Sequence, residues 1–294
     1  MIVQGGVGMD KVIIFGGYEF LGFSLCEAFL EKGIQVCTMN TQQVDDLFLE
    51  NKRLLVGRNS NFTECSLEKS LDTWSYANEK LLIVLSFYDF YLKGESSNIH
   101  SELDQVILDA LKTCETGDLE VLFLLPVQFL EREESTLKGE GLKNIYNTMC
   151  QELQSSFIPN TTIYLPTLYG PWQSEDYLFH HALLEEVRGQ NEVELQVNDH
   201  EYTEDALFVE DAIIEIVKIV EGQKNTICRF TSTSQNQWRK CAEFLDISTE
   251  KYMRSNKTIK PIIDIAKYEV RESIGYVQAL TKQKKHLQRI LEEF

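Results

Sequence analysis

The chain has 294 residues, of which 43% are apolar, so it can bury a substantial core. Its 28 basic and 46 acidic side chains give a formal net charge of −18. This excess of negative charge argues against binding to nucleic acid or to an anionic membrane surface, because both require basic patches. The sequence therefore predicts no nucleic-acid and no membrane partner.

The cysteines are scattered along the chain, and no two have the C-x-x-C spacing of a metal or redox motif. There are seven of them: Cys26, Cys37, Cys65, Cys114, Cys150, Cys228 and Cys241. The odd number and the lack of a pairing pattern predict a reducing compartment, the cytoplasm, with no disulfide framework and no metal site. No run reaches the ~18–20 apolar residues of a membrane span. The first residues also lack the basic and apolar regions of a signal peptide.

β-type runs alternate with helical patterns through the first 165 residues. The expected strands are 11–16, 34–39, 53–57, 81–87, 119–125 and 161–165. The expected helices are 20–32, 42–50, 67–78, 98–115 and 140–155. This alternation is typical of parallel βαβ units, and it predicts an α/β fold with a Rossmann-like, doubly wound parallel sheet.

Beyond Pro166 the pattern loosens, which indicates a smaller C-terminal lobe. The expected helices are 176–188, 210–221, 235–245, 262–273 and 279–292, and the expected strands are 193–198, 207–209 and 226–230. We expect residues 1–170 to form a Rossmann-like domain of the NAD(P)-binding type, to which residues 204–232 return. Residues 171–203 and 233–294 are expected to form the smaller, substrate-type lobe.

The stretch Lys11–Val36 has the form of a dinucleotide-binding βαβ unit with one altered position. Gly16 and Gly22 occupy the outer positions of a fingerprint of three glycines, and Glu19 occupies the middle one. The middle glycine lets the backbone approach a pyrophosphate closely, so Glu19 predicts weakened cofactor binding. The vestigial cofactor-binding residues expected here are Gly16, Gly17, Glu19, Phe20, Leu21, Gly22 and Asn40.

Two interpretations of Glu19 stay open. An acid at the start of a helix is favoured by the helix dipole alone. Alternatively, its carboxylate occupies the anion site that a pyrophosphate would fill, as an internal mimic of the ligand.

Four strings resemble the extended short-chain dehydrogenase/reductase family, which contains the nucleotide-sugar epimerases and dehydratases. They are FGGYEFLG at 15–22, YLPTLYGPWQ at 164–173, EDALFVEDA at 204–212 and ESIGYV at 272–277. Their order and spacing match the family over nearly the whole chain. The resemblance implies a Rossmann-type fold with an NAD(P) site; it does not by itself imply activity.

The resemblance implies that the catalytic residues of the family are lost. The family uses a tyrosine and a lysine one helical turn apart, with a serine or threonine at the end of the fifth strand. Lys143 holds the lysine position, but Gly139 holds that of the tyrosine. Strand 119–125 runs into Pro126, Val127 and Gln128, so the hydroxyl is missing as well. No catalytic residue is therefore assigned.

The binding positions of the family are altered too. Asn40 stands near the position of the acid that holds the ribose of NAD. Leu165 replaces one arginine of the family, and Glu204 replaces another that contributes to diphosphate binding in the sugar-nucleotide enzymes. Reversal of that charge should repel a diphosphate. NAD(P) is thus the implied cofactor, with expected affinity reduced, and no metal is implied.

The resemblance places a substrate cleft at Pro166, Tyr169, Trp172, His180 and His181. Aromatic packing and surface exposure of the histidines are the competing explanations. Helices 98–115 and 140–155 correspond to the pair that forms a dimer interface in many family members. We therefore expect a dimer of this chain with itself or with an intact homologue.

The preferred interpretation is a degenerate family member that acts as a non-catalytic binding, regulatory or scaffold protein. One alternative is a divergent NAD(P)-dependent nucleotide-sugar epimerase, dehydratase or reductase, with Glu134, Glu140 or His180 as a substitute acid or base beside Lys143. Another is a small-molecule sensor that uses the old substrate cleft. The first needs no cofactor, the second needs cofactor and turnover, and the third needs a ligand without turnover.

Overall fold

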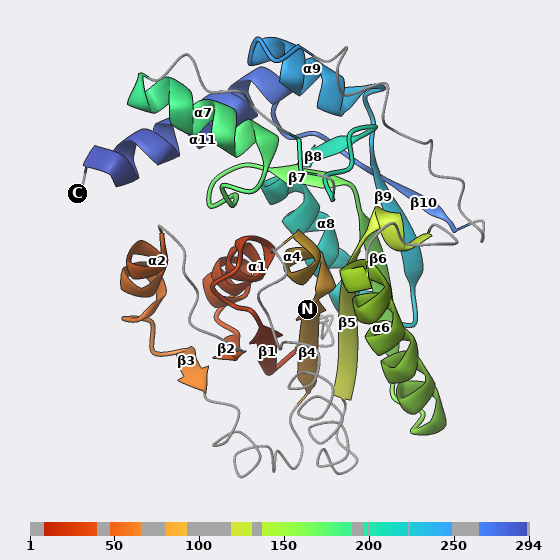
Figure 1. Ribbon diagram of the computed structural model, residues 1–294. Coiled ribbons are helices and arrows are strands. Elements are labelled where there is room, and N and C mark those ends of the chain that lie inside the picture. Colours follow the sequence, from red (N-terminus) through yellow and green to blue (C-terminus); the bar gives the residue numbers. More distant parts are fainter. Residues whose placement is uncertain are drawn as a thin grey trace, which may run out of the picture. The chain divides into compact units, whose positions relative to one another are not determined.

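The computed structural model has an α/β fold and describes residues 9–39, 48–65, 80–92, 119–130, 137–189, 197–198, 200–222, 224–248 and 265–292 (Figure 1). The larger sheet contains β1 (Lys11–Phe15), β2 (Gln35–Met39), β3 (Phe62–Cys65), β4 (Leu81–Ser86), β5 (Leu119–Pro126), β6 (Asn160–Leu165), β9 (Ile227–Ser232) and β10 (Lys267–Val270). A two-stranded sheet contains β7 (Thr167–Tyr169) and β8 (Ala206–Phe208). The helices are α1 (Phe20–Glu31), α2 (Leu49–Val56), α4 (Phe87–Leu92), the 3-10 helix η2 (Val127–Leu130), α6 (Leu137–Ser155), α7 (Leu178–Arg188), α8 (Val209–Gly222), α9 (Gln237–Phe244) and α11 (Tyr276–Glu292).

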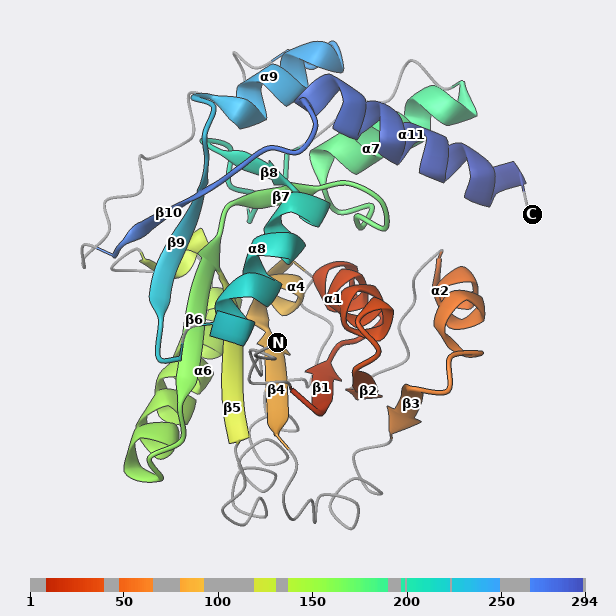
Figure 2. The same ribbon diagram turned by 180° about the vertical axis from the view of Figure 1, so that it is seen from behind.

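The larger sheet has the strand order β10-β9-β6-β5-β4-β1-β2-β3. The pairs β1–β2, β2–β3, β1–β4, β4–β5 and β9–β10 are all parallel. From β1 the chain adds strands on one side and then on the other, which confirms the doubly wound sheet that the sequence predicts. Every residue of β4 is buried, as expected for a central strand covered on both faces. Figure 2 shows α6 lying beside β5 from behind, as it does in Figure 1.

The chain divides into two compact units. Unit 1 comprises Met1–Leu125, Glu133–Ile163 and Ile216–Ile227, and unit 2 comprises Pro126–Arg132, Tyr164–Glu215 and Cys228–Phe294. Unit 1 thus holds β1 to β4 with α1, α2, α4 and α6. Unit 2 holds the two-stranded sheet, η2, α7, α9 and α11. The domain boundaries drawn from the sequence stay a prediction.

Residues 53–57 were predicted as a strand, but residues 53–56 belong to helix α2 and Gly57 is its C-cap. The run contains two adjacent leucines, but Leu54 and Leu55 are 69% and 56% exposed. The buried residues of α2 are Lys52 and Val56, which lie four positions apart on one helical face. The strand prediction failed because the apolar run was short. The helical pattern was also hidden, since one of the two residues on the buried face of α2 is a lysine.

Residues 267–270, predicted within a helix at 262–273, form strand β10 instead. They pair with β9 in parallel, from Lys267 opposite Arg229 to Val270 opposite Ser232. This pairing across the sheet overrides the local helical pattern. Helices 67–78 and 98–115 and residues 193–196 were also predicted as regular elements, and they lie outside the described residues. The dimer expected through helices 98–115 and 140–155 therefore stays a prediction.

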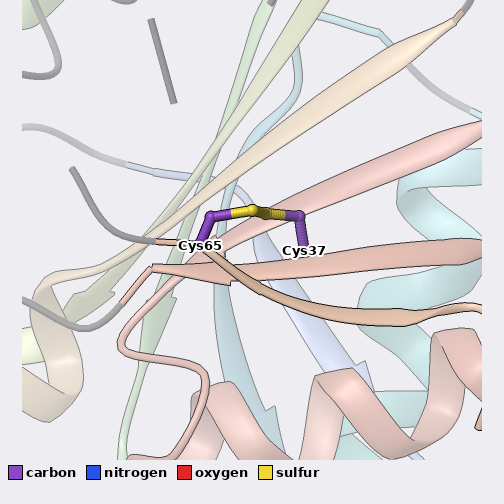
Figure 3. Close-up of a disulfide and its surroundings, with 2 residues drawn as sticks. All are labelled: Cys37 and Cys65. Atoms are coloured by element: carbon purple, nitrogen blue, oxygen red, sulfur yellow. A yellow bond between two sulfur atoms is a disulfide. The ribbon is translucent and has the colours of Figure 1, made fainter. Parts of the chain in front are cut away.

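Cys37 and Cys65 form a disulfide between β2 and β3 (Figure 3). In the parallel register Thr38 lies opposite Glu64 and Met39 opposite Cys65, so the two cysteines sit diagonally on neighbouring strands. Their Cα atoms are 6.4 Å apart, within the range that a disulfide spans. This bridge corrects the expectation that the cysteines stay unpaired. Sequence spacing missed it because the two residues are 28 positions apart and only the sheet brings them together.

The other described cysteines behave as the sequence predicts. Cys26, Cys228 and Cys241 are buried free thiols, and Cys150 is half-buried. Burial raises the pKa of Cys26 and of Cys241 to about 12, so both stay protonated and act as apolar core residues. Within the described part of the chain, no helix combines the length and the apolar character needed to cross a bilayer.

Candidate functional site

The glycine turn between β1 and α1 forms a compact loop whose shape requires its glycines. Gly16 has a φ of +77°, in the left-handed region that favours glycine. A Cβ atom on Gly22 would lie 2.1 Å from the carbonyl oxygen of Gly16, and one on Gly17 would lie 2.2 Å from the Cγ2 atom of Thr38. The glycines therefore have a structural role in bringing α1 close to the end of β1, whether or not a cofactor binds.

Glu19 is the residue immediately before α1, and its side chain makes no capping hydrogen bond to that helix. Its backbone is extended, with φ −70° and ψ 173°, and its N–H donates to the Gly16 carbonyl oxygen at 2.9 Å. The hypothesis that the Glu19 carboxylate occupies the anion site is corrected here, since another residue occupies it.

The carboxylate at the start of α1 belongs to Asp89, from the short helix α4. Its Oδ1 atom accepts the Leu21 N–H and its Oδ2 atom accepts the Gly22 N–H, both at 3.0 Å. The Ser86 hydroxyl donates to Oδ2 at 2.8 Å. These N–H groups belong to the first turn of the helix, where a Rossmann fold binds pyrophosphate. A buried side chain of the protein thus holds the position of an anionic ligand.

Burial raises the pKa of Asp89 to about 6, and the negative charge of Glu19 acts in the same direction. The hydrogen bonds from Leu21, Ser86 and Gly22 oppose this rise, because they stabilise the ionised form. The site therefore contains two carboxyl groups close to the helix N-terminus. Both disfavour a further anion.

Sequence reasoning missed Asp89, although a local signal was present. Ser86 and Asp89 form an S-x-x-D pattern, in which the serine hydroxyl accepts the Asp89 N–H at 3.4 Å. The parallel register brings Phe15 of β1 opposite Leu85 of β4, so both strands end at the same edge. Asp89 follows β4 closely and therefore reaches the start of α1.

The outer side of the glycine turn is held by a buried lysine that sequence reasoning also missed. Lys52 is 1% exposed, and its Nζ atom donates to the Tyr18 carbonyl oxygen at 2.7 Å. It lies 5.7 Å from the centre of the Phe23 ring. The Tyr18 hydroxyl donates to Glu64 at 3.2 Å, and burial followed by this acid raises the pKa of Tyr18 to about 12. The turn is thus fixed from α2 and β3. Asn40 lies outside the described residues.

The family's catalytic positions lie on α6. Gly139 is buried and Lys143, one turn further, is half-buried. The tyrosine on this helix is Tyr146, whose ring packs edge-on against Phe123 at 5.1 Å. The Tyr146 hydroxyl lies 3.3 Å from the Thr162 hydroxyl. One helical turn after Tyr146 the chain has Cys150, where the family pattern would require a lysine. Tyr146 therefore has a packing role at β5 and β6.

No residue from 119 to 130 carries a hydroxyl, so β5 and η2 supply no group in place of the family serine. Gln128, which follows β5, donates from its Nε2 atom to the His200 carbonyl oxygen at 2.6 Å. Of the substitute acids, Glu140 is exposed on α6 and Glu134 lies outside the described residues. The described residues contain no group of three potential metal ligands.

The predicted cleft residues of unit 2 are mostly packed inside it. Tyr169 is 1% exposed and packs edge-on against Phe179 at 5.9 Å, and burial raises its pKa. His180 is 1% exposed on α7, whereas His181 is half-exposed and lies 3.9 Å from Glu185. Pro166 links β6 to β7.

Trp172 has a left-handed backbone, with a φ of +67°. Its ring packs edge-on against His286 at 4.1 Å. Left-handed conformations of bulky residues store strain, and they cluster at ligand-binding positions. Neighbouring Gln173 donates to the Leu168 carbonyl oxygen and accepts from Gln283, both at 2.7 Å, which fixes the loop before α7.

Glu204, at the position of the diphosphate arginine, accepts the Tyr202 hydroxyl at 2.8 Å. The same hydroxyl accepts a hydrogen bond from Arg229 at 2.8 Å. Tyr202 thus links the Glu204 carboxylate to the Arg229 guanidinium. Leu165, at the other arginine position, is buried.

The chain matches no protein-family model and no curated protein, yet it is similar to many solved structures. One is UDP-glucuronic acid 4-epimerase from Bacillus cereus, a mutant in complex with a fluorinated UDP-glucuronic acid and NAD. The TM-score is 0.68 at 14% identity, over 95% of this chain and 99% of that one. UDP-glucose 4-epimerase from Thermotoga maritima with UDP-glucose gives 0.66 at 14% identity, over 96% and 99%.

A third structure is dTDP-glucose 4,6-dehydratase from Bacillus anthracis in complex with NAD. Its TM-score is 0.66 at 12% identity, over 96% of this chain and 97% of that one. At such identities the likeness shows the fold alone. The resemblance drawn from the sequence motifs is thus confirmed at that level: the chain has the fold of the epimerases and dehydratases of the extended short-chain dehydrogenase/reductase family.

Proposed function

We propose that this chain is a non-catalytic binding, regulatory or scaffold protein built on the fold of those enzymes. The observation that carries the proposal is the Asp89 carboxylate, which accepts the Leu21 and Gly22 N–H groups at 3.0 Å. A pyrophosphate needs these donors. To bind there it must displace a buried carboxylate and approach Glu19 as well.

The positions of the chemistry support the same proposal. Gly139 has no side chain to act as an acid or base, and β5 ends without a hydroxyl. Glu204 brings negative charge where a diphosphate would need a cation. An enzyme that had only changed its substrate would keep the cofactor site, because the cofactor supplies the chemistry.

The proposal is tested by calorimetric titration with NAD⁺, NADH, NADP⁺ and NADPH. At about 1 mM nucleotide we expect no heat and no shift in melting temperature from the wild type. Asp89→Ala combined with Glu19→Gly should gain weak binding, because it removes both carboxylates from the helix N-terminus. Glu201→Ala, which removes a similarly buried acid from unit 2, is the matched control and should gain none. Micromolar binding by the wild type would refute the proposal.

The second candidate is a divergent NAD(P)-dependent enzyme acting on a nucleotide sugar. Lys143 on α6 favours it, because that residue type is kept at the position that holds the ribose in the family. Two of the solved structures described above contain NAD. This candidate requires both nucleotide binding and turnover of a sugar nucleotide, and Lys143→Ala should abolish the turnover.

The third candidate is a small-molecule sensor that uses the segment from Pro166 to Tyr177. The left-handed Trp172, packed against His286, favours it. Native mass spectrometry of the freshly purified protein should then detect a bound molecule that is released unchanged. Trp172→Gly relieves the backbone strain and should lower occupancy without unfolding the chain.

A further inference from the structure

Helix α11, which ends near the C label in Figure 1, has two chemically different faces. One face is buried, chiefly through Ala279, Leu280, Leu287 and Ile290. On the other side Lys282, Lys285 and Arg289 are exposed. Residues three or four positions apart lie on one side of a helix, so these cations form a single line. We call Lys282, Lys285 and Arg289 the basic stripe.

An open groove with a volume of about 610 Å³ follows the basic stripe. All the described residues that line it belong to α11, from Val277 at one end to Glu292 at the other. At 1.5 Å per residue this lining spans ~22 Å along the helix. The groove is therefore long relative to a single phosphate group and comparable to a short peptide.

Much of the charge of the basic stripe is uncompensated. Lys282 pairs with Glu210 and lies 5.8 Å from the Phe208 ring. Within the described ranges, neither Lys285 nor Arg289 takes part in an ion pair. In a chain with a net charge of −18, the stripe is a local reversal of sign. Such a surface can attract a negatively charged group locally, although the protein as a whole repels negative charge.

The N-terminal end of the groove carries an exposed apolar side chain. Val277, which lines the groove there, is 41% exposed. Apolar contacts beside charged positions are typical of protein–protein interfaces, where the apolar contact supplies affinity and the charges supply orientation.

We propose that the basic stripe, together with Val277, is a docking surface for an acidic segment of a protein partner that carries an apolar residue at one end. The length of the groove favours an extended or helical segment over a small anion. The net charge of −18 disfavours nucleic acid. This inference is independent of whether the glycine turn binds a nucleotide.

The first experiment presents the full chain to an array of peptides of about 15 residues, long enough to span the groove as a helix. Their net charges range from about −6 to about +6. The overall charge of the protein predicts selection of basic peptides, whereas the basic stripe predicts selection of acidic peptides with an apolar residue near one end. A lack of acidic selection would overturn the proposal.

The second experiment measures the dissociation constant of the best acidic peptide by fluorescence anisotropy. The triple variant Lys282→Glu, Lys285→Glu, Arg289→Glu should weaken binding by at least about tenfold, and Val277→Ala should weaken it too. Lys240→Glu, Lys267→Glu, Arg271→Glu makes the same change in net charge elsewhere in unit 2 and should leave binding within about twofold. Equal losses in both triple variants, or displacement of the peptide by tripolyphosphate or single-stranded DNA at lower concentration, would refute the protein partner.

Discussion

Each of the two units contains a buried acid that accepts at least one backbone N–H at the start of a helix. In unit 1, Asp89 accepts the Leu21 and Gly22 N–H groups of α1. In unit 2, Glu201 accepts the Leu178 N–H of α7 and the indole N–H of Trp238, both at 3.0 Å. Neither helix has a side-chain cap of its own, so in each case a residue distant in sequence supplies the missing acceptor.

The two acids differ in what surrounds them. Glu201 joins α7 to Trp238, which is 1% exposed, so its role is explained by packing. Asp89 lies at a glycine turn of the type that binds pyrophosphate, beside a second carboxyl group, Glu19. Both acids thus satisfy donors at a helix start, and only Asp89 does so at a turn where other Rossmann folds bind pyrophosphate.

The largest expected effect concerns the glycine turn before α1, which has no counterpart before α7. Gly22→Ala would place a Cβ atom 2.1 Å from the Gly16 carbonyl oxygen, which is backbone and cannot move aside cheaply. We expect a loss of more than about 3 kcal/mol in unfolding free energy, or failure to fold. Gly222→Ala, where no atom lies within 4 Å, is the control and should change stability by less than about 0.5 kcal/mol. A tolerated Gly22→Ala in urea unfolding would mean that α1 lies further from the turn.

Removal of each acid separates the two roles. Asp89→Ala leaves the Leu21 and Gly22 N–H groups and the Ser86 hydroxyl without their acceptor. Glu201→Ala leaves the Leu178 N–H and the Trp238 indole N–H without theirs. Each variant should therefore cost about 3 kcal/mol in unfolding free energy. Only Asp89→Ala should regain about 1 kcal/mol in about 50 mM phosphate, because the exposed N–H groups can bind the anion. Thermal unfolding with and without phosphate measures the difference. Equal recovery of both variants would show that the anion effect is not specific to the glycine turn.

The pH dependence of stability tests the environments of both acids. Burial raises the pKa of Asp89 from 3.8 to about 6 and that of Glu201 from 4.5 to about 7. The folded chain therefore holds protons that the unfolded chain releases, so this stabilisation is complete below pH 4 and is lost as the pH rises through 6 and 7. The expected loss is on the order of 2–3 kcal/mol for each group.

Asp89→Asn should remove the part of that loss between about pH 4 and 6, and Glu201→Gln the part between about pH 4.5 and 7. Urea unfolding of the three proteins across this range measures both differences. A wild-type curve parallel to that of either variant would contradict the raised pKa of the acid concerned.

The smallest effects concern the donors. Ser86→Ala removes the hydroxyl that donates to Asp89, and Trp238→Phe removes the indole N–H that donates to Glu201. Each should cost about 1 kcal/mol, and each should raise the pKa of its acid further, because one hydrogen bond to the ionised form is lost. Carboxyl titration by nuclear magnetic resonance measures the pKa change. An unchanged Asp89 pKa in Ser86→Ala would show that the Ser86 hydroxyl does not stabilise the ionised form of Asp89.

Much of the fold could be predicted from local patterns. The apolar runs of β1, β4 and β5 are long enough to identify central strands, and the glycine turn identifies the first βαβ unit. The wrong secondary-structure predictions concerned segments whose apolar pattern was short or irregular. In α2 one of the two buried residues is Lys52, and β10 is a strand because it pairs with β9.

The candidate site was predictable only in part. The sequence showed Glu19 at the position of the middle glycine and left two interpretations open, and the one that placed its carboxylate in the anion site named the wrong residue. Asp89 is 67 positions from Gly22, and the two meet because β1 and β4 are parallel neighbours that end at the same edge. The Cys37–Cys65 bridge has the same origin, since β2 and β3 are neighbours in the sheet.

The sequence by itself determined the α/β class, the glycine turn, the absence of any hydroxyl side chain from residue 119 to 130, and the net charge of −18. These properties depend on residue type, periodicity and order along the chain. The tertiary structure alone decided which carboxylate caps α1, which lysine holds the turn and which cysteines pair. Those contacts join residues on different strands and helices, and their distances are fixed by the order and register of the strands.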